Sequence, residues 1–371
     1  MMDPGKLGKV VEGINARGLT GLVIYSRGTT FVLRPSYLYY FSGARPVGRN
    51  TAAILSKTGR TVLLVEPAWD ASRLQSKTWI TDVRGTSRFL NDLSGILDEL
   101  KITSAVGVMG SEEMGTDLRA VLLKRGRIEE VGDIIEDLAG EKTERELRVI
   151  RETGKIADVG FKAFLKYARV GIREYELLAE MEYAMRSAGA NDIFNLVSSG
   201  SHNQAMHAPS DRRFAPGDIV IAEITPAREG QFIQLCRTVV LGEPSPVLKE
   251  KYAILVEGLE RSMGEIRSGN PASLLSNAMN RVIGDAGYSK YCYPPFMRAR
   301  GHGFGVGSIA PGAVIDDNTR VALKRHQVVI AHPNQYFPET GYLACGETVL
   351  VTDTGPERLS ETETKLYWNE V

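Results

Sequence analysis

The sequence predicts two domains: a smaller N-terminal α/β domain over residues 1–140 and a larger C-terminal α+β domain over residues 141–371. The chain of 371 residues is longer than one ordinary hydrophobic core accommodates. Its first third alternates short strand and helix patterns, whereas the part beyond residue 189 consists mainly of long apolar strands broken by glycine turns. This change of texture places a domain boundary near residue 140.

The N-terminal domain is expected to contain both strands and helices. Residues 20–26 and 104–110 are short apolar runs typical of buried strands. Residues 50–56 and 61–67 flank a KTGR turn and predict a hairpin. Residues 87–100 carry apolar side chains at helical spacing.

A long helix is predicted at the start of the C-terminal domain. Thr143 and Glu146 have the spacing of a capping box, and an apolar stripe continues through residues 147–164. A second helix, over residues 173–188, is expected to end at Gly189.

The remainder of the C-terminal domain is expected to form a curved, mostly antiparallel sheet covered by helices. Residues 248–267 and 272–286 have helical apolar spacing. The predicted strands are residues 194–200, 218–227, 232–242, 327–333 and 347–353. Strands and helices in this order are typical of an α+β domain.

Composition excludes several classes of protein. Lys+Arg and Asp+Glu both total 45, so the zero net charge argues against a nucleic-acid partner. We expect no membrane partner and no signal peptide, because no apolar run approaches bilayer length and the N-terminus lacks an apolar core. Cys236, Cys292 and Cys345 lie far apart, which favours a reducing cytoplasm and buried thiols.

Histidines are the chemically informative residues of the second domain. His202 and His207 lie in one loop, His302 lies between glycines, and His332 ends a predicted strand. His326 is interpreted as a polar turn residue. A lone histidine is more often structural than functional, but strand ends and glycine loops of one sheet tend to converge on one pocket.

Several segments together resemble a known superfamily. SSGSHNQAMHAPSDRRFAPGDIV, GHGFG and VVIAHPNQYFPETGYLACGETVLVTDTG resemble the sequence of the creatinase, aminopeptidase P and prolidase superfamily, which has the M24 pita-bread fold. In the first domain, YYFSGARPVGRNTAAIL resembles a segment of creatinase-type N-terminal domains. The resemblance spans nearly the whole chain in order. It implies a pita-bread C-terminal domain with a smaller creatinase-like N-terminal domain.

The resemblance also indicates that the usual metal ligands are altered. Metallopeptidases of the superfamily hold two ions with two Asp, one His and two Glu. The corresponding positions here are Glu223, Gln234, His302, His332 and Gly346, with Glu347 beside the last. Two close divalent ions need several carboxylates, so this set predicts no dinuclear site.

Creatinase, a metal-free member, provides a second template. His207 matches its acid/base histidine, and Arg49 matches an arginine that reaches a substrate carboxylate from the neighbouring subunit. The creatinase glutamates fall on Cys236 and His332, so creatine is not the expected substrate.

Our main hypothesis from the sequence is therefore a metal-independent creatinase-like hydrolase or lyase without a cofactor. It would act on a C–N bond of a small polar molecule that carries a carboxylate. His207 would serve as general acid and base. His302, His332 and Glu223 would complete the catalytic group and stabilise developing charge. The predicted substrate-binding residues are Arg49, Gln234, Arg298, Arg300 and Glu347.

The same hypothesis includes a cytoplasmic homodimer in which Arg49 reaches the partner's site. Two alternatives stay open. In one, Glu223, His302 and His332 hold a single metal ion in an Xaa-Pro peptidase-like enzyme. In the other, the chain is a non-catalytic member that only binds a small molecule or protein.

Overall fold

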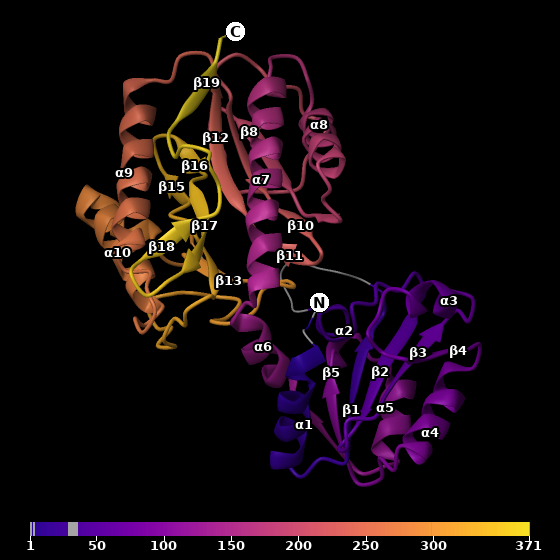
Figure 1. Ribbon diagram of the computed structural model, residues 1–371. Helices are drawn as coiled ribbons and strands as arrows, with labels where there is room; N and C mark the ends of the chain where they lie inside the picture. Colours follow the sequence, from indigo (N-terminus) through magenta and orange to yellow (C-terminus); the bar gives the residue numbers. More distant parts are fainter. Residues whose placement is uncertain (1, 3, 29–35, 298, 371) are drawn as a thin grey trace. The chain divides into compact units, whose positions relative to one another are not determined.

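The computed structural model describes residues 2, 4–28, 36–297 and 299–370. The chain divides into two compact units, Met1–Ala139 and Gly140–Val371. Figure 1 colours the chain along its sequence. Among the helices that are described, none has both the length and the apolar character needed to cross a membrane.

The N-terminal unit is built on a six-stranded mixed sheet in the order β4-β3-β2-β1-β5-β6. Its strands are β1 (Gly21–Ser26), β2 (Asn50–Ser56), β3 (Thr61–Glu66), β4 (Asp82–Gly85), β5 (Ala105–Met109) and β6 (Arg127–Glu130). The antiparallel pairing of β2 with β3 confirms the predicted hairpin. β1 lies between β2, with which it pairs antiparallel, and β5, with which it pairs parallel.

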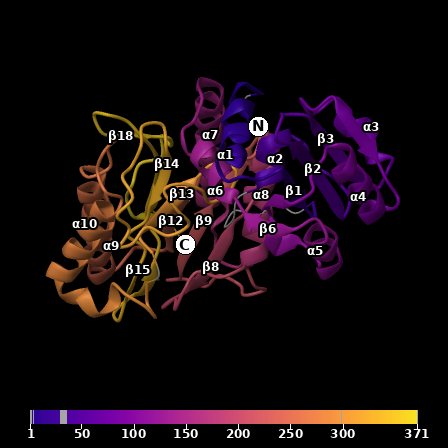
Figure 2. The ribbon, with the colours of Figure 1, turned by 90° about the horizontal axis from the view of Figure 1, so that it is seen from below.

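Helices cover both faces of this sheet, with α4 and α5 on one face and α1 and α6 on the other (Figures 1 and 2). The helices are α1 (Leu7–Ala16), α2 (Tyr37–Ser42), α3 (Asp70–Gln75), α4 (Phe89–Glu99), α5 (Thr116–Leu123) and α6 (Gly132–Gly140). Phe89, Leu93 and Leu97 of α4 pack with Val23 and Ile54 of the sheet. The helical spacing of these apolar residues therefore matches the face that α4 buries.

The C-terminal unit is built on an eight-stranded sheet. Six strands run in the order β13-β14-β17-β12-β9-β8, with β18 paired to β17 and β19 to β12. The strands of the unit are β7 (Asp192–Ile193), β8 (Leu196–Gly200), β9 (Ile219–Ile224), β10 (Pro226–Arg228), β11 (Gln231–Phe232), β12 (Leu235–Leu241), β13 (Gly301–Phe304), β14 (Val328–Ala331), β15 (Gln335–Phe337), β16 (Gly341–Leu343), β17 (Gly346–Val351), β18 (Pro356–Arg358) and β19 (Tyr367–Asn369). Pairing along the main path is antiparallel throughout, as predicted.

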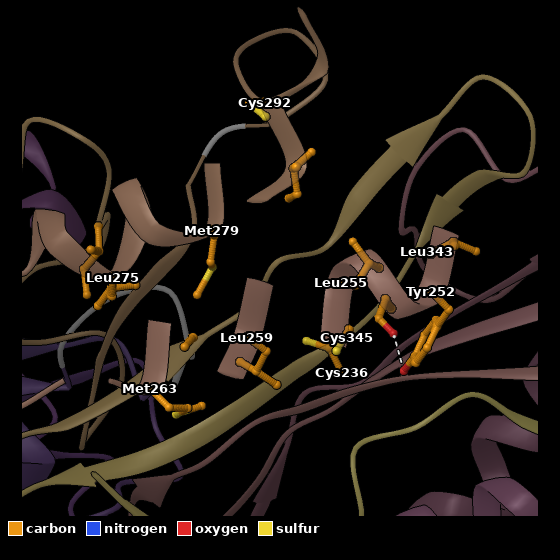
Figure 3. Close-up of a cluster of buried hydrophobic side chains, with 14 of the residues drawn as sticks. Cys236, Tyr252, Leu255, Leu259, Met263, Leu275, Met279, Cys292, Leu343 and Cys345 are labelled. Carbon is orange, nitrogen blue, oxygen red and sulfur yellow. Dashed lines mark hydrogen bonds between the residues drawn. The ribbon is translucent and has the colours of Figure 1, made fainter. Parts of the chain in front are cut away.

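Four helices accompany this sheet: α7 (Glu144–Tyr167), α8 (Glu174–Ser187), α9 (Pro246–Met263) and α10 (Ser273–Ile283). Thr143 and Glu146 form the predicted capping box. α7 packs with α8, and α9 with α10. A core of buried side chains, some of which are labelled in Figure 3, links α9 and α10 to the sheet. Tyr252 of α9 belongs to this core and donates a hydrogen bond to the Ala344 carbonyl at 3.4 Å.

Candidate active site

Strand register brings together most residues at the altered metal-ligand positions. Cys236 on β12 pairs with Glu223 on β9 and with Gly346 on β17. Directly paired residues in an antiparallel sheet point to the same face. Gln234 is two residues before Cys236 and donates from Nε2 to its Sγ at 3.6 Å, so it belongs to this face too.

The two histidines complete the same group. His302 pairs with Ile330 on β14, and His332 follows two residues later on the same side of the chain. The His302 and His332 ring centroids are 5.9 Å apart. We call Glu223, Gln234, Cys236, His302 and His332 the imidazole–carboxylate cluster.

Gly346 explains how His332 is accommodated. A Cβ atom built on Gly346 would lie 2.8 Å from the His332 Cβ and 3.2 Å from the Cys236 Cβ. Separations under 3 Å do not occur between real Cβ atoms, so β17 approaches β14 too closely for a side chain here. The glutamate that metallopeptidases carry at this position therefore does not fit this backbone.

The glycine loop around His302 also depends on close backbone approach. A Cβ on Gly303 would lie 2.1 Å from the Ile309 carbonyl oxygen and 2.4 Å from that of Ala310. His302 is 8% exposed, and its Nδ1 lies 3.2 Å from the Gly303 carbonyl oxygen. Because a carbonyl only accepts, this contact places the ring proton on Nδ1 and the lone pair on Nε2.

Glu223 is the one carboxylate of the cluster. Protein surrounds it closely although a part of its surface stays accessible, and burial raises its pKa to about 7. Burial also raises the pKa of Tyr342 and Cys236, and the negative charge of Glu223 adds to both shifts. Glu223 therefore lies in a poorly hydrated place where a proton or a cation would stabilise it.

His207 lies in the loop between β8 and β9. Its backbone N–H donates to Ser198 Oγ at 2.8 Å, which ties the loop to β8. The ring is exposed, and its Nδ1 donates to the Ala208 carbonyl at 2.7 Å. Ser198 pairs with Ile221, so the loop is anchored on the face that also carries Glu223. Its predicted acid/base role stays a prediction.

Glu347 does not lie where the sequence analysis expected it. It is fully buried and forms an ion pair with the equally buried Arg237, and Thr364 Oγ1 donates to it at 2.8 Å. Side chains alternate along β17, so Glu347 points away from the face of Gly346. The expectation that Glu347 binds substrate is corrected: its carboxylate compensates a buried guanidinium.

The predicted substrate-binding arginines have separate locations. Arg300 is 2% exposed and donates to Asn280 Oδ1, the Asn334 carbonyl and Gln335 Oε1 at 2.7–2.8 Å. These three acceptors engage Nε, Nη1 and Nη2 of the guanidinium group, so Arg300 connects separate segments of the C-terminal unit. The expectation that Arg300 binds the substrate carboxylate is therefore corrected. Arg298 lies outside the described residues. Arg49 is exposed and lines a cavity of the N-terminal unit.

Sequence reasoning missed two members of the site's surroundings. Cys236 was interpreted as a small buried hydrophobe, and it is indeed a buried free thiol, but it occupies the centre of the cluster. Tyr342 was not singled out, although its phenol is close enough to Glu223 for their charges to interact. Cys236 reaches the cluster through the pairing of β12 with β9 and β17, and Tyr342 lies on β16, which pairs with β15. These contacts join residues far apart in the chain, so no local sequence pattern predicts them.

The donor set decides which metal centre the cluster suits. Two ions do not fit, because Glu223 is its single carboxylate and Gln234 is a neutral, weak ligand. One ion suits the chemistry of two imidazoles and a carboxylate. Within the described ranges no three His, Cys, Asp or Glu side chains are grouped as ready ligands. A single ion would therefore require side chains of the cluster to turn toward it.

A mixed N-terminal unit and, in the C-terminal unit, an antiparallel sheet with an altered ligand face together define a pita-bread hydrolase scaffold. Residues 148–353 match the model of metallopeptidase family M24. The match covers more than half of the chain, which therefore belongs to this family. The family resemblance seen in the sequence is confirmed, and so is the expectation of an M24-type hydrolase.

Curated relatives match along nearly the whole chain. An Xaa-Pro dipeptidase of Pyrococcus furiosus is 27% identical over 342 residues, covering 91% of this chain and 94% of the relative. An Xaa-Pro dipeptidase of Pyrococcus horikoshii is 26% identical over 367 residues, covering 97% and 98%.

Solved structures confirm the predicted fold. The X-Pro aminopeptidase from Thermotoga maritima superposes with a TM-score of 0.86 at 22% identity, covering 100% of both chains. The prolidase from Pyrococcus furiosus superposes with a TM-score of 0.82 at 25% identity, covering 95% of this chain and 99% of that one.

These comparisons overturn the main functional hypothesis. The relatives are named Xaa-Pro dipeptidases and prolidases, and the family is one of metallopeptidases. A metal-independent creatinase-like hydrolase is therefore the wrong description. The hypothesis of a metal-independent enzyme relied on the number of carboxylates missing from the ligand set. That number argues against a dinuclear centre, but it does not argue against a single ion.

Proposed function

We propose that this chain hydrolyses Xaa-Pro or similar peptide bonds and uses one divalent ion held by the imidazole–carboxylate cluster. The observation that carries the proposal is the pairing of His302 and His332, with ring centroids 5.9 Å apart, on the same sheet face as Glu223. The nearly full-length similarity to Xaa-Pro dipeptidases supports this substrate class.

His302, His332 and Glu223 would hold the ion. When bound, a divalent ion supplies Lewis acidity toward the scissile carbonyl. The Nδ1 contact of His302 with the Gly303 carbonyl fixes the tautomer in which Nε2 carries the lone pair. Within the described residues Glu223 accepts no hydrogen bond, so its carboxylate has ligand capacity to offer.

His207 is proposed as the residue that moves protons. Its Nδ1–H is engaged by the Ala208 carbonyl, so Nε2 is the acceptor atom of the exposed ring. An imidazole both takes and returns a proton near neutral pH, which suits activation of water followed by protonation of the leaving amine. Gln234 would contribute a neutral amide for binding the substrate. The homodimer, the cytoplasmic location and the reach of Arg49 to a partner's site stay predictions.

Metal titration of purified protein tests the proposal. After chelator treatment, manganese, cobalt and zinc are titrated by calorimetry, and proline release from an Xaa-Pro dipeptide is followed. We expect one ion per chain, loss of binding in His302→Ala and His332→Ala, and normal binding in the control His326→Asn. Asn suits the control because His326 has a φ of 69°. His207→Ala should abolish proline release without changing the metal stoichiometry.

Two results would contradict this function. Two ions per chain would mean that the ligand count is wrong. If the protein takes up no metal and releases no proline, the result would favour the second candidate, a member of the family that binds a ligand without catalysis. The observation in favour of that candidate is the lack of a ready group of three ligands among the described side chains.

A further inference from the structure

The N-terminal unit contains a cavity of about 430 Å³ that is separate from the cluster. Tyr25 lines it at the carboxyl end of β1, Asn50 at the start of β2 and Leu118 in the first turn of α5. β1 pairs with β2 on one side and with the parallel strand β5 on the other. Open α/β sheets bind ligands at such a switch point, outside the carboxyl ends of strands, and the volume suits a small molecule.

Two guanidinium groups give this cavity its charge. Arg27 and Arg49 line it, and both are exposed. Within the described part of the chain, Arg49 has neither a hydrogen-bond nor an ion-pair partner. Asp117 is the acidic lining residue, and its Oδ1 accepts from the Leu118 amide at 2.8 Å. Two arginines and one aspartate are therefore the charged residues of the described lining, while Glu113, which accepts from the Arg27 amide at 2.6 Å, lies next to it.

The polar wall is ordered without a ligand. Tyr25 donates to Asn50 Oδ1, and Asn50 Nδ2 donates to Glu66 Oε2. Burial raises the pKa of Tyr25, which keeps its phenol neutral. Asp117 in the lining and Glu66 and Glu113 beside it oppose a doubly negative group, whereas a single carboxylate can still contact the exposed guanidinium groups of Arg49 and Arg27.

An apolar wall faces the same space. Phe89 and Leu90, at the start of α4, line the cavity together with Leu118. The Phe89 ring lies 6.1 Å from that of Tyr25. These side chains favour a ligand with a branched aliphatic or aromatic group next to its charge.

We propose that this cavity binds a small monocarboxylate that carries an apolar group. Arg49 and Arg27 receive the carboxylate, and Phe89, Leu90 and Leu118 receive the apolar group. Planar guanidinium groups bind carboxylates in a bidentate manner, which accounts for two arginines at one end. Every lining residue belongs to the N-terminal unit. Because Arg49 is also the residue predicted to reach a partner's site, the test measures ligand binding and not peptidase activity.

Binding of 4-methylvalerate to the full-length protein tests this proposal. Calorimetry should show one site per chain, with no binding of 4-methylvaleramide or inorganic phosphate at the same concentration. Arg49→Gln should weaken binding by at least about tenfold, the loss expected for one charge-assisted contact. Asp117→Asn keeps an acceptor oxygen for the Leu118 amide but removes the negative charge, so it should strengthen binding. Lys124→Gln, at the far end of α5, is the matched control for net charge.

The opposite pattern would overturn the proposal. Equal affinity in the wild type and Arg49→Gln, or weaker binding in Asp117→Asn, would place the carboxylate elsewhere. Equal binding of the amide would show that the charge is irrelevant, and tighter binding of phosphate would assign the cavity to another ligand class. Melting temperatures close to the wild type are expected, because Arg49 is exposed and Asn keeps an acceptor for the Leu118 amide.

Discussion

Glu347→Gln tests whether the carboxylate of Glu347 is structural or part of the site. The substitution keeps the shape of the side chain and removes the charge that compensates Arg237. Both side chains are fully buried, and Arg237 also donates to the carbonyls of Cys236, Gly346 and Thr362 at 2.8–3.1 Å. Those carbonyls remain after the substitution, but none carries a full negative charge.

The expected cost follows from this burial. Removing one partner of a buried ion pair typically destabilises a protein by about 3–5 kcal/mol, because the other charge remains without compensation. In a unit of roughly this size, 1 kcal/mol shifts the melting temperature by about 2–4 °C. Glu347→Gln should therefore lower the melting temperature of the C-terminal unit by at least about 6 °C.

Urea unfolding followed by tryptophan fluorescence and circular dichroism measures this effect. The double variant Arg237→Met with Glu347→Leu is the control, and it should recover most of the lost stability because it removes both charges. A Glu347→Gln protein that unfolds like the wild type but has a raised KM would refute the reasoning and restore Glu347 to substrate binding.

Three further outcomes are expected. Arg300→Gln should lower the unfolding free energy by about 2–4 kcal/mol through its lost hydrogen bonds; a raised KM at unchanged stability would contradict this. Burial opposes ionisation of Asp70, but Arg73 at 2.6 Å and the Val47 amide at 2.9 Å outweigh it and lower the pKa of Asp70 below its ordinary 3.8. The stabilising contribution of the Asp70 carboxylate is therefore complete well above its ordinary pKa and is lost as the pH falls through its lowered pKa in the folded state. Asp70→Asn should destabilise the protein at pH 7, and this loss should shrink as the pH falls below 3.8, as acid titration of unfolding will show. Gly303→Ala should lower the free energy of unfolding by about 4 kcal/mol or more, because the new Cβ would overlap two carbonyl oxygens. The control Gly95→Ala has open space around its Cβ and should be neutral or stabilising, and melting experiments on both variants measure the difference.

Local patterns were sufficient to predict the scaffold. The capping box at Thr143 and Glu146 and the apolar stripe after it define α7, and the β2–β3 hairpin follows from its turn. These features depend on neighbours within a few positions, where propensity and periodicity act directly. The weak strands β4 and β6 were missed, because they are short, polar and only partly buried.

The sequence predicted the site residues correctly only where a recognised motif assigns a residue to a position on the ligand-bearing face of the sheet. Glu223, His302 and His332 were recognised from the family resemblance, and the strand pairing brings them to one face. Glu347 was misplaced because one residue along β17 separates the face of the cluster from that of Arg237. Arg300 was misplaced because its acceptors, Asn280, Asn334 and Gln335, come from segments far along the chain.

The contact between Gly346 and His332 limits which substitutions this edge of the sheet accepts. Gly346→Glu introduces a Cβ at 2.8 Å from that of His332, and His332→Glu leaves that Cβ in place. Neither single change, nor both together, recreates a two-glutamate edge unless β14 and β17 first move apart. A protein engineer who wished to install a second ion here would begin with the spacing of these two strands. The spacing of β14 and β17 is therefore a design constraint that comes before the choice of ligands.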